Sequence, residues 1–219
     1  MRLRLVLVPL LLIARNASIA AEPEISDRAN VEWKQTASHN EVVIYSRLHP
    51  GSRLKEFKAV GDIAASPARV HQVIDDVDAY PAFMPYVSEC RVIKRDGDSL
   101  ITYQRVSPKI CSDRDYALRI TEKTSPGPAG LSFLNQWTVA NEFAPPKKNG
   151  VIRISLCQGA WWLEPAVGNT THATYSIYTD TGGLIPAFLA NHFSQGAIER
   201  IFGAIRQRVR DAKYDSAAH

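Results

Sequence analysis

The sequence predicts an α+β domain in which a curved antiparallel β-sheet wraps around one long C-terminal α-helix. Six segments between residues 89 and 180 alternate apolar and polar residues, and stretches such as SPGPAG and PAVGNT, typical of turns, separate several of them. Near the C-terminus a stripe of apolar residues recurs at helical spacing: Ile198, Ile201, Phe202, Ile205 and Val209. Curvature of the sheet leaves space beside this helix, for either a packed core or a ligand cavity.

The first 20 residues have the pattern of a secretory signal: a basic start, an apolar run and small residues before Ala21. We expect cleavage after Ala20, export to the periplasm, and one domain over residues 21–219. The signal contains three arginines and no acidic residue, so the 26 lysines and arginines of the chain fall to 23, against 22 aspartates and glutamates. This near balance gives no indication of nucleic-acid binding.

Two helices and two strands are expected before the main group of strands. Residues 22–40 are polar around two large apolar residues, and we expect a loosely packed helix there. Residues 42–47 and 54–63 have strand-like alternation. Ser66 and Pro67 are typical of the N-cap and first position of a helix.

The remaining strands are expected over residues 89–95, 99–106, 115–123, 131–139, 151–164 and 171–180. Asp96-Gly97-Asp98 is a typical hairpin turn between the first two of these. After the last strand, residues 184–193 are apolar nearly all round, and Ser194 is expected to mark a break before the main C-terminal helix.

Three motifs appear in order along this part of the chain. Arg114-Asp115-Tyr116 opens a predicted strand, Gly159-Ala160-Trp161-Trp162 lies within another, and residues 183–191 join the last strand to the C-terminal helix. In these motifs the chain resembles the START domains, the lipid-transfer domains related to the steroidogenic acute regulatory protein. The resemblance covers residues from about 25 to 213 and implies the helix-grip fold, whose C-terminal helix closes a tunnel over the sheet.

The resemblance and the alternation together predict which side chains line this tunnel. The apolar and aromatic residues expected there are Tyr103, Phe133, Trp137, Ile154, Tyr175, Ile177, Leu184, Phe188, Leu189 and Phe202. Two polar residues, Arg105 and Asn135, share strand faces with members of this set. A polar group in an apolar cavity orients a ligand, whereas one that faces solvent has no such function, and the sequence leaves both interpretations open.

The resemblance implies a protein that binds, and transfers or senses, a lipid or other hydrophobic small molecule, and that contacts a membrane surface transiently. We expect a monomer without a cofactor, a metal ion or catalytic residues. An enzyme of the cyclase or aromatase type on the same scaffold is the alternative, and a module whose side chains fill the cavity is a third. A carrier is favoured because no acid–base pair or cofactor motif stands out.

Three cysteines, Cys90, Cys111 and Cys157, permit one disulfide and one free thiol in an exported protein, and the sequence does not pair them. The triplet Asp113-Arg114-Asp115 could be catalytic, but we expect it to hold a loop by ion pairs. The histidines His39, His49, His71 and His172 lie in polar contexts, where we expect surface residues.

Overall fold

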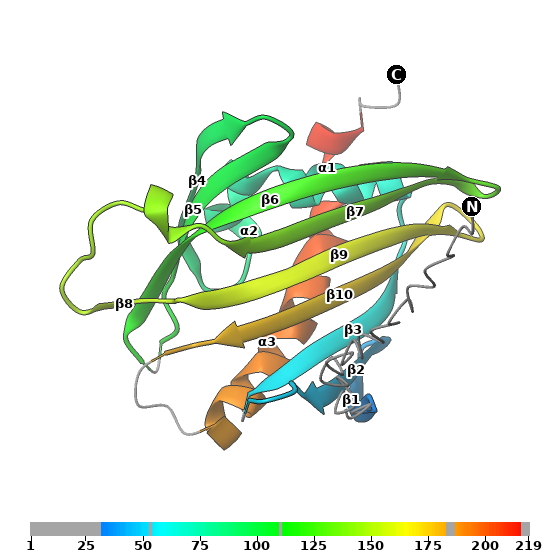
Figure 1. The fold of residues 1–219 in the computed structure, drawn as a ribbon. Helices are drawn as coiled ribbons and strands as arrows, with labels where there is room; N and C mark the ends of the chain where they lie inside the picture. Colours follow the sequence, from blue (N-terminus) through cyan, green and yellow to red (C-terminus); the bar gives the residue numbers. More distant parts are fainter. Residues whose placement is uncertain (1–31, 53, 110, 183–186, 216–219) are drawn as a thin grey trace, which may run out of the picture. The chain divides into compact units, whose positions relative to one another are not determined.

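The computed structural model describes residues 32–52, 54–109, 111–182 and 187–215, with the side chains of the last range described from residue 195 onward. In this part of the chain ten strands form one sheet (Figure 1). They follow the order β1-β2-β3-β10-β9-β7-β6-β5-β4, and β8 pairs with β6 beside this path. Their bounds are β1 (Lys34–His39), β2 (Val42–Leu48), β3 (Lys55–Ile63), β4 (Val87–Asp96), β5 (Ser99–Val106), β6 (Asp113–Gly127), β7 (Gly130–Val139), β8 (Val151–Arg153), β9 (Leu156–Ala166) and β10 (Thr170–Asp180).

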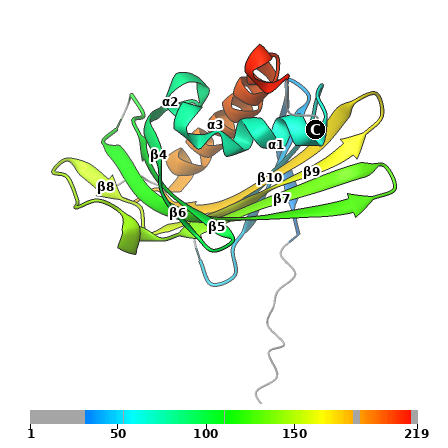
Figure 2. The ribbon, with the colours of Figure 1, turned by 90° about the horizontal axis from the view of Figure 1, so that it is seen from above.

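The three α-helices of the described part gather on one side of this sheet. Figure 2 shows α1, α2 and α3 lying together on its concave face. The helical elements are α1 (Pro67–Asp75), η1 (Val77–Ala79), α2 (Tyr80–Phe83), η2 (Asn141–Phe143), α3 (Ala187–Arg208) and η3 (Ala212–Tyr214). The predicted curved antiparallel sheet against a long C-terminal helix is therefore confirmed.

The first helix begins where the sequence predicts. The Ser66 hydroxyl accepts a hydrogen bond from the backbone N–H of Arg69 at 3.3 Å, and Pro67 occupies the first helical position. Val70 and Val73 are fully buried against the main core, which joins α1 and α3 to β2, β3, β9 and β10. This packing fixes α1 over one end of the concave face.

The C-terminal helix differs from the prediction in its continuity. The predicted apolar stripe is buried except for the partly buried Ile201, and Phe202 and Ile205 are completely inaccessible to solvent. The helix is continuous from Ala187 to Arg208, so the expected break at Ser194 is wrong. Phe202 approaches the sheet at Gly61, where a Cβ atom would lie 3.2 Å from the Phe202 ring, so the glycine permits this close packing.

The expected helix over residues 22–40 is wrong for its described part, because Lys34–His39 is the edge strand β1. Asn40 and Glu41 have positive φ angles of 49° and 58°, the conformation of the two-residue hairpin turn that joins β1 to β2. Hydrogen bonding to β2 therefore makes residues 34–39 a strand, because their polar side chains give little preference for helix or strand.

The predicted strand over 151–164 is two strands. β8 pairs with β6 in parallel, whereas β9 pairs antiparallel with β7 and β10. Between them the backbone N–H of Ile154 donates to the Asp115 carbonyl, and this bond holds the segment against β6 before the chain turns into β9. No helix among the described residues is long and apolar enough to cross a membrane.

Candidate functional site

A cavity of about 270 Å³ lies between the concave face of the sheet and the helices. Its walls come from α1, η1 and α2 on one side, from α3 on another, and from six strands beneath. Alternation explains the sheet wall, since Tyr116, Leu118 and Ile120 are every second residue of β6 and all line the cavity.

Most of the lining is apolar. The aliphatic and sulfur-containing members are Ile74, Val77, Met84, Val87, Cys90, Val106, Leu118, Ile120, Cys157, Ile177, Ala197, Ile198 and Ile201, with Pro85 among them. Trp161 and Tyr175 pack with ring centroids 4.7 Å apart, and Trp137 lies 5.8 Å from Tyr175. These three rings form one aromatic wall, a surface suited to apolar and ring-containing molecules.

Asn135 is the most deeply buried amide of this lining. Its side chain comes from β7, and the residue is 2% exposed. The side-chain oxygen Oδ1 is buried and accepts no hydrogen bond from any described residue. Such an unmet acceptor costs about 1–3 kcal/mol, so the fold keeps a polar atom in this wall at the expense of stability.

Two cysteine thiols also line the cavity. Burial raises the pKa of Cys90 to about 12 and that of Cys157 to about 11, so both remain protonated and weakly nucleophilic at neutral pH. Cys111 is partly exposed, and the three cysteines are all free thiols, so the disulfide that the sequence permits does not form in this structure.

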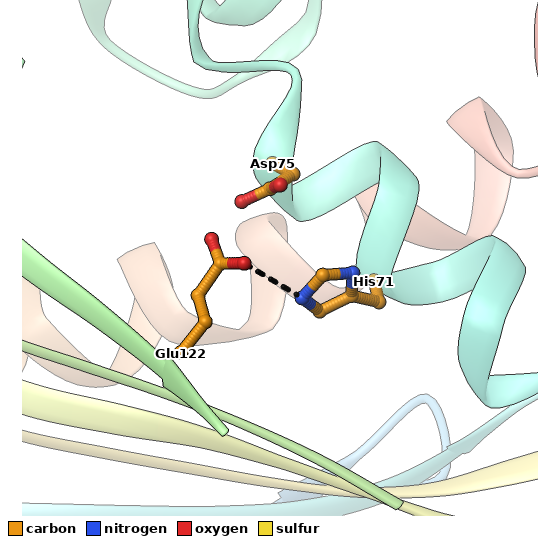
Figure 3. Close-up of side chains that lie close together, drawn as sticks. All are labelled: His71, Asp75 and Glu122. Atoms are coloured by element: carbon orange, nitrogen blue, oxygen red, sulfur yellow. Dashed lines mark ion pairs between the residues drawn. The ribbon is translucent and has the colours of Figure 1, made fainter. Parts of the chain in front are cut away.

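His71, Asp75 and Glu122 lie close together between α1 and β6 (Figure 3). His71 and Asp75 lie one turn apart on α1, and Glu122 rises from β6 toward them. His71 Nε2 is 3.5 Å from a Glu122 carboxylate oxygen, and its ring stacks on Phe133 with centroids 4.5 Å apart. Of the three, Asp75 lines the cavity.

The two carboxyl groups of this cluster have opposite acidities. Burial, followed by the hydrogen bond and repulsion from Glu122, raises the pKa of Asp75 to about 7. Hydrogen bonds from His71 and Asp75 lower the pKa of Glu122 to about 2. Asp75 therefore carries the proton that the pair shares, and Glu122 carries the charge.

The same three residues are the candidate metal ligands of the described part. One ligand atom from each lies within 4.8 Å of the others. A nitrogen and two carboxylate oxygens suit a divalent cation, but these groups also satisfy one another through the ion pair and the shared proton. The cluster needs no metal to explain its geometry.

The structure brings together four of the predicted tunnel residues, since Asn135, Trp137, Tyr175 and Ile177 all line the cavity. Phe133, Ile154 and Phe202 are buried in the adjacent core and are not part of the lining. Leu184, and the side chains of Phe188 and Leu189, lie outside the described residues. Contact of any of these residues with a ligand remains a prediction.

Tyr103 and Arg105, predicted to share a face with the tunnel residues, lie on the face of β5 that points away from the cavity. The residues of β5 that line the cavity are Thr102, Gln104 and Val106, so their neighbours point to the convex side. There the Tyr103 hydroxyl donates to an Asp115 carboxylate oxygen at 3.0 Å, and Arg105 pairs with Asp113 at 2.6 Å.

The triplet Asp113-Arg114-Asp115 makes structural contacts, as the sequence analysis expected. Asp115 pairs with Arg153 at 2.7 Å, and Arg114 Nε donates to the Thr181 carbonyl at 3.2 Å. Burial would raise the pKa of Asp115, but hydrogen bonds from Arg153 and Tyr103 hold it below its ordinary value. These contacts tie the β6 start to β8 and to the end of β10.

Sequence reasoning missed the contribution of the first helices and the carboxyl cluster. His71 was expected at the surface, but only 16% of its side chain is exposed, because it packs between Phe133 and Glu122. The i, i+4 spacing of His71 and Asp75 was available in the sequence. Nothing in the sequence placed Glu122 beside them, because that contact depends on where α1 crosses the sheet.

Comparison with known proteins identifies the family of this chain and one relative in sequence. The model of a family described as polyketide cyclase / dehydrase and lipid transport matches residues 63–206. An uncharacterized protein of Pseudomonas aeruginosa is 30% identical over 164 residues, which cover 74% of this chain and 79% of that protein.

Solved structures share the fold. A STAR-related lipid transfer protein of Xanthomonas axonopodis has a TM-score of 0.71 at 24% identity, covering 82% of this chain and 99% of that one. Human StAR-related lipid transfer protein 5 has a TM-score of 0.69 at 17% identity, covering 84% of this chain and 88% of that one. Because both sequence identities are below 25%, these matches are evidence for the fold alone. They confirm the predicted START-like helix-grip fold.

Proposed function

Because the chain belongs to the polyketide cyclase / dehydrase and lipid transport family, we propose that it binds a hydrophobic small molecule in its cavity and carries it unchanged. The relatives named as lipid transfer proteins make a lipid the first class of ligand to test. Fold and family alone leave the reaction open, so the proposal depends on the site.

The observation that carries the proposal is the apolar cavity of about 270 Å³. Apolar surface buried against this lining is favourable by about 25 cal/mol per Å². The lining offers a bound molecule aromatic and aliphatic contacts.

Mass spectrometry of the purified protein under native conditions tests the proposal directly. We expect a bound molecule that denaturation releases into an organic extract. The same molecule, added to protein stripped of ligand, should be recovered chemically unchanged after incubation. Protein that purifies empty and also fails to bind a fluorescent apolar probe would contradict the proposal.

A variant that fills the cavity provides the matched control. Ala197 lies on α3 and lines the cavity, so Ala197→Phe places a ring in the ligand space. Gln207 is exposed on the same helix, and Gln207→Phe adds a ring there without touching the cavity. We expect probe binding to weaken at least about tenfold in the first variant and to remain unchanged in the second.

A second candidate is an enzyme, favoured by one observation. Asp75 lines the cavity and its carboxyl, with a pKa of about 7, has the acidity of a general acid–base group at neutral pH. In that case the recovered molecule would differ from the one added, and Asp75→Asn would abolish the conversion while retaining binding.

The cellular setting is a further part of the proposal. We propose export with cleavage after Ala20, supported by the residue pattern of the first 20 residues. N-terminal sequencing of protein from the native host should begin at Ala21, and retention of Met1 would contradict it. We also propose a monomer that exchanges ligand at a membrane surface, which sedimentation and liposome-transfer measurements test.

A further inference from the structure

The cavity lining holds one buried hydrogen-bond acceptor, Asn135 Oδ1, that finds no donor among the described residues. Glu122 on β6 lies directly opposite Asn135 on β7 in the sheet. Asp75 approaches Glu122 from α1, and Figure 3 shows the two carboxyl groups facing each other. Asp75 and Asn135 both line the cavity. Together, Asp75, Glu122 and Asn135 form what we call the acceptor end of the cavity.

Asn135 supplies the unmet acceptor of this end of the cavity. The residue is 98% buried, and its Oδ1 atom finds no donor among the described residues. An amide oxygen can only accept, so whatever satisfies it must carry an N–H or O–H group. Keeping this oxygen unmet weakens the fold unless a bound molecule restores the hydrogen bond.

Asp75 adds a carboxyl group to the same space. Its proton is shared with Glu122, so the oxygen left free toward the cavity is an acceptor. Glu122 is engaged by His71 on α1, and Arg95 on β4 also faces the pair. A carboxylate in the cavity would add a negative charge beside the one that the Asp75–Glu122 pair already holds, and would offer Asn135 Oδ1 no proton.

We propose that the cavity selects hydrophobic molecules that end in a hydrogen-bond donor, an alcohol or a protonated amine, and discriminates against those that end in a carboxylate. This inference rests on the proposed function, because it assigns the polar end of the ligand that the cavity binds. The donor meets Asn135 Oδ1 and the Asp75 carboxyl group, while the apolar part lies along the aromatic wall.

Four molecules with the same carbon chain test the selectivity: decanol, decylamine, decanoate and decane. Each is titrated at pH 7.5 against full-length protein loaded with a fluorescent apolar probe, and its affinity is taken from displacement of the probe. We expect decanol or decylamine to bind at least about tenfold more tightly than decanoate and decane, the difference expected for one buried hydrogen bond. Comparable affinity of decanoate and decanol, with decylamine no tighter, would overturn the inference.

Paired variants locate the preference. Asn135→Leu removes the unmet oxygen and should reduce the preference for decanol over decane to about twofold or less, with probe binding retained. Gln136→Leu makes the same chemical change one residue later, on the opposite face of β7, and should leave the preference intact. An undiminished preference in folded Asn135→Leu would overturn the assignment to this residue.

The wild-type series alone keeps the inference falsifiable if Asn135→Leu does not fold. Failure of the protein to bind the probe or any of the four molecules would overturn the proposed function and the inference with it. Binding of decane and decanoate as tightly as both donors would retain the proposed function and overturn only the selectivity. The variant Asp75→Asn distinguishes the alcohol from the amine. If it loses affinity for decylamine but not for decanol, the ammonium group binds at Asp75.

Discussion

Gly159 lies directly against the indole of Trp137, its partner across β9 and β7. A Cβ atom on Gly159 would come within 2.5 Å of Trp137 Cζ2 and within 2.2 Å of the Ser176 carbonyl oxygen. The absence of a side chain therefore lets the Trp137 ring lie across the sheet and line the cavity. This contact explains why the Gly-Ala-Trp-Trp motif of β9 begins with glycine.

We predict that Gly159→Ala lowers the free energy of unfolding by about 1–3 kcal/mol, because the new methyl group overlaps a packed ring and a backbone carbonyl. Urea denaturation measures the change, and displacement of Trp137 should also alter its fluorescence. Gly203, in α3, has no atom within 4 Å of the position of a Cβ, so Gly203→Ala should stabilise the helix by about 0.5–1 kcal/mol. Equal effects of the two substitutions would contradict this role of Gly159.

Asp115 should be among the most costly acids to replace. It is 1% exposed and accepts hydrogen bonds from Arg153 Nε at 2.7 Å and from the Tyr103 hydroxyl at 3.0 Å. Asp115→Ala leaves the Arg153 charge nearly buried without a partner, and we expect a loss of about 3–5 kcal/mol in unfolding free energy.

Asp113 supplies the control for that measurement within the same triplet. Its pair with Arg105 has both side chains more than a quarter exposed, so Asp113→Ala should cost no more than about 1 kcal/mol. The difference should also depend on pH. Because the pKa of Asp115 is lowered in the folded protein, its contribution is present above the ordinary value of 3.8 and is lost as the pH falls below it.

The sequence predicts the fold well because its strongest patterns are local. The stripe on α3, the Ser66 cap and the Asp96-Gly97-Asp98 turn each involve neighbouring residues, and all appear in the structure. The failure on β5 has a different cause. Leu100, Ile101, Thr102 and Tyr103 are all buried, because the helices cover one face of this strand and the segment from η2 to β8 lies over the other. Alternation cannot orient a strand that is buried on both faces.

The candidate site was only partly predictable for a similar reason. Asn135 was identified as a polar residue on an apolar face, and it does line the cavity. The pairing of Asp75 with Glu122 depends on the crossing of α1 over β6, a tertiary relationship that neither local sequence contains. Helix residues that line the cavity, such as Val77 and Ala197, are not among the predicted tunnel residues, because an apolar helix residue in a cavity has the same pattern as one in a core.

The cysteines should differ strongly in reactivity. Burial holds the Cys90 and Cys157 thiols protonated, with pKa values of about 12 and about 11, whereas Cys111 is partly exposed and contacts Arg114 Nη1 at 2.7 Å. We predict that iodoacetamide at pH 7.5 modifies Cys111 at least about tenfold faster than either buried thiol. Peptide mass spectrometry over a time course gives the three rates, and modification of Cys90 at the rate of Cys111 would show that the cavity is open to the reagent.

The last prediction concerns the pH dependence that Asp75 confers on stability. Burial and the neighbouring Glu122 raise its pKa from 3.8 to about 7, so between these values the folded protein holds a proton that the unfolded chain has released. A rise in pH through this window therefore favours unfolding, and the stability contribution of the protonated carboxyl is lost by about pH 7. Glu122, whose pKa is lowered from 4.5 to about 2, changes stability only below about pH 4.5, so the range above pH 5 reports on Asp75. Asp75→Asn cannot titrate and its amide can still donate to Glu122, so the melting temperature of the wild type should fall relative to this variant between pH 5 and pH 8.

The control is Asp98→Asn, on the exposed hairpin turn. It removes the same charge and should follow the wild type across the range. Parallel curves for the wild type and Asp75→Asn, measured by differential scanning calorimetry at several pH values, would show that the carboxyl pair does not share a proton.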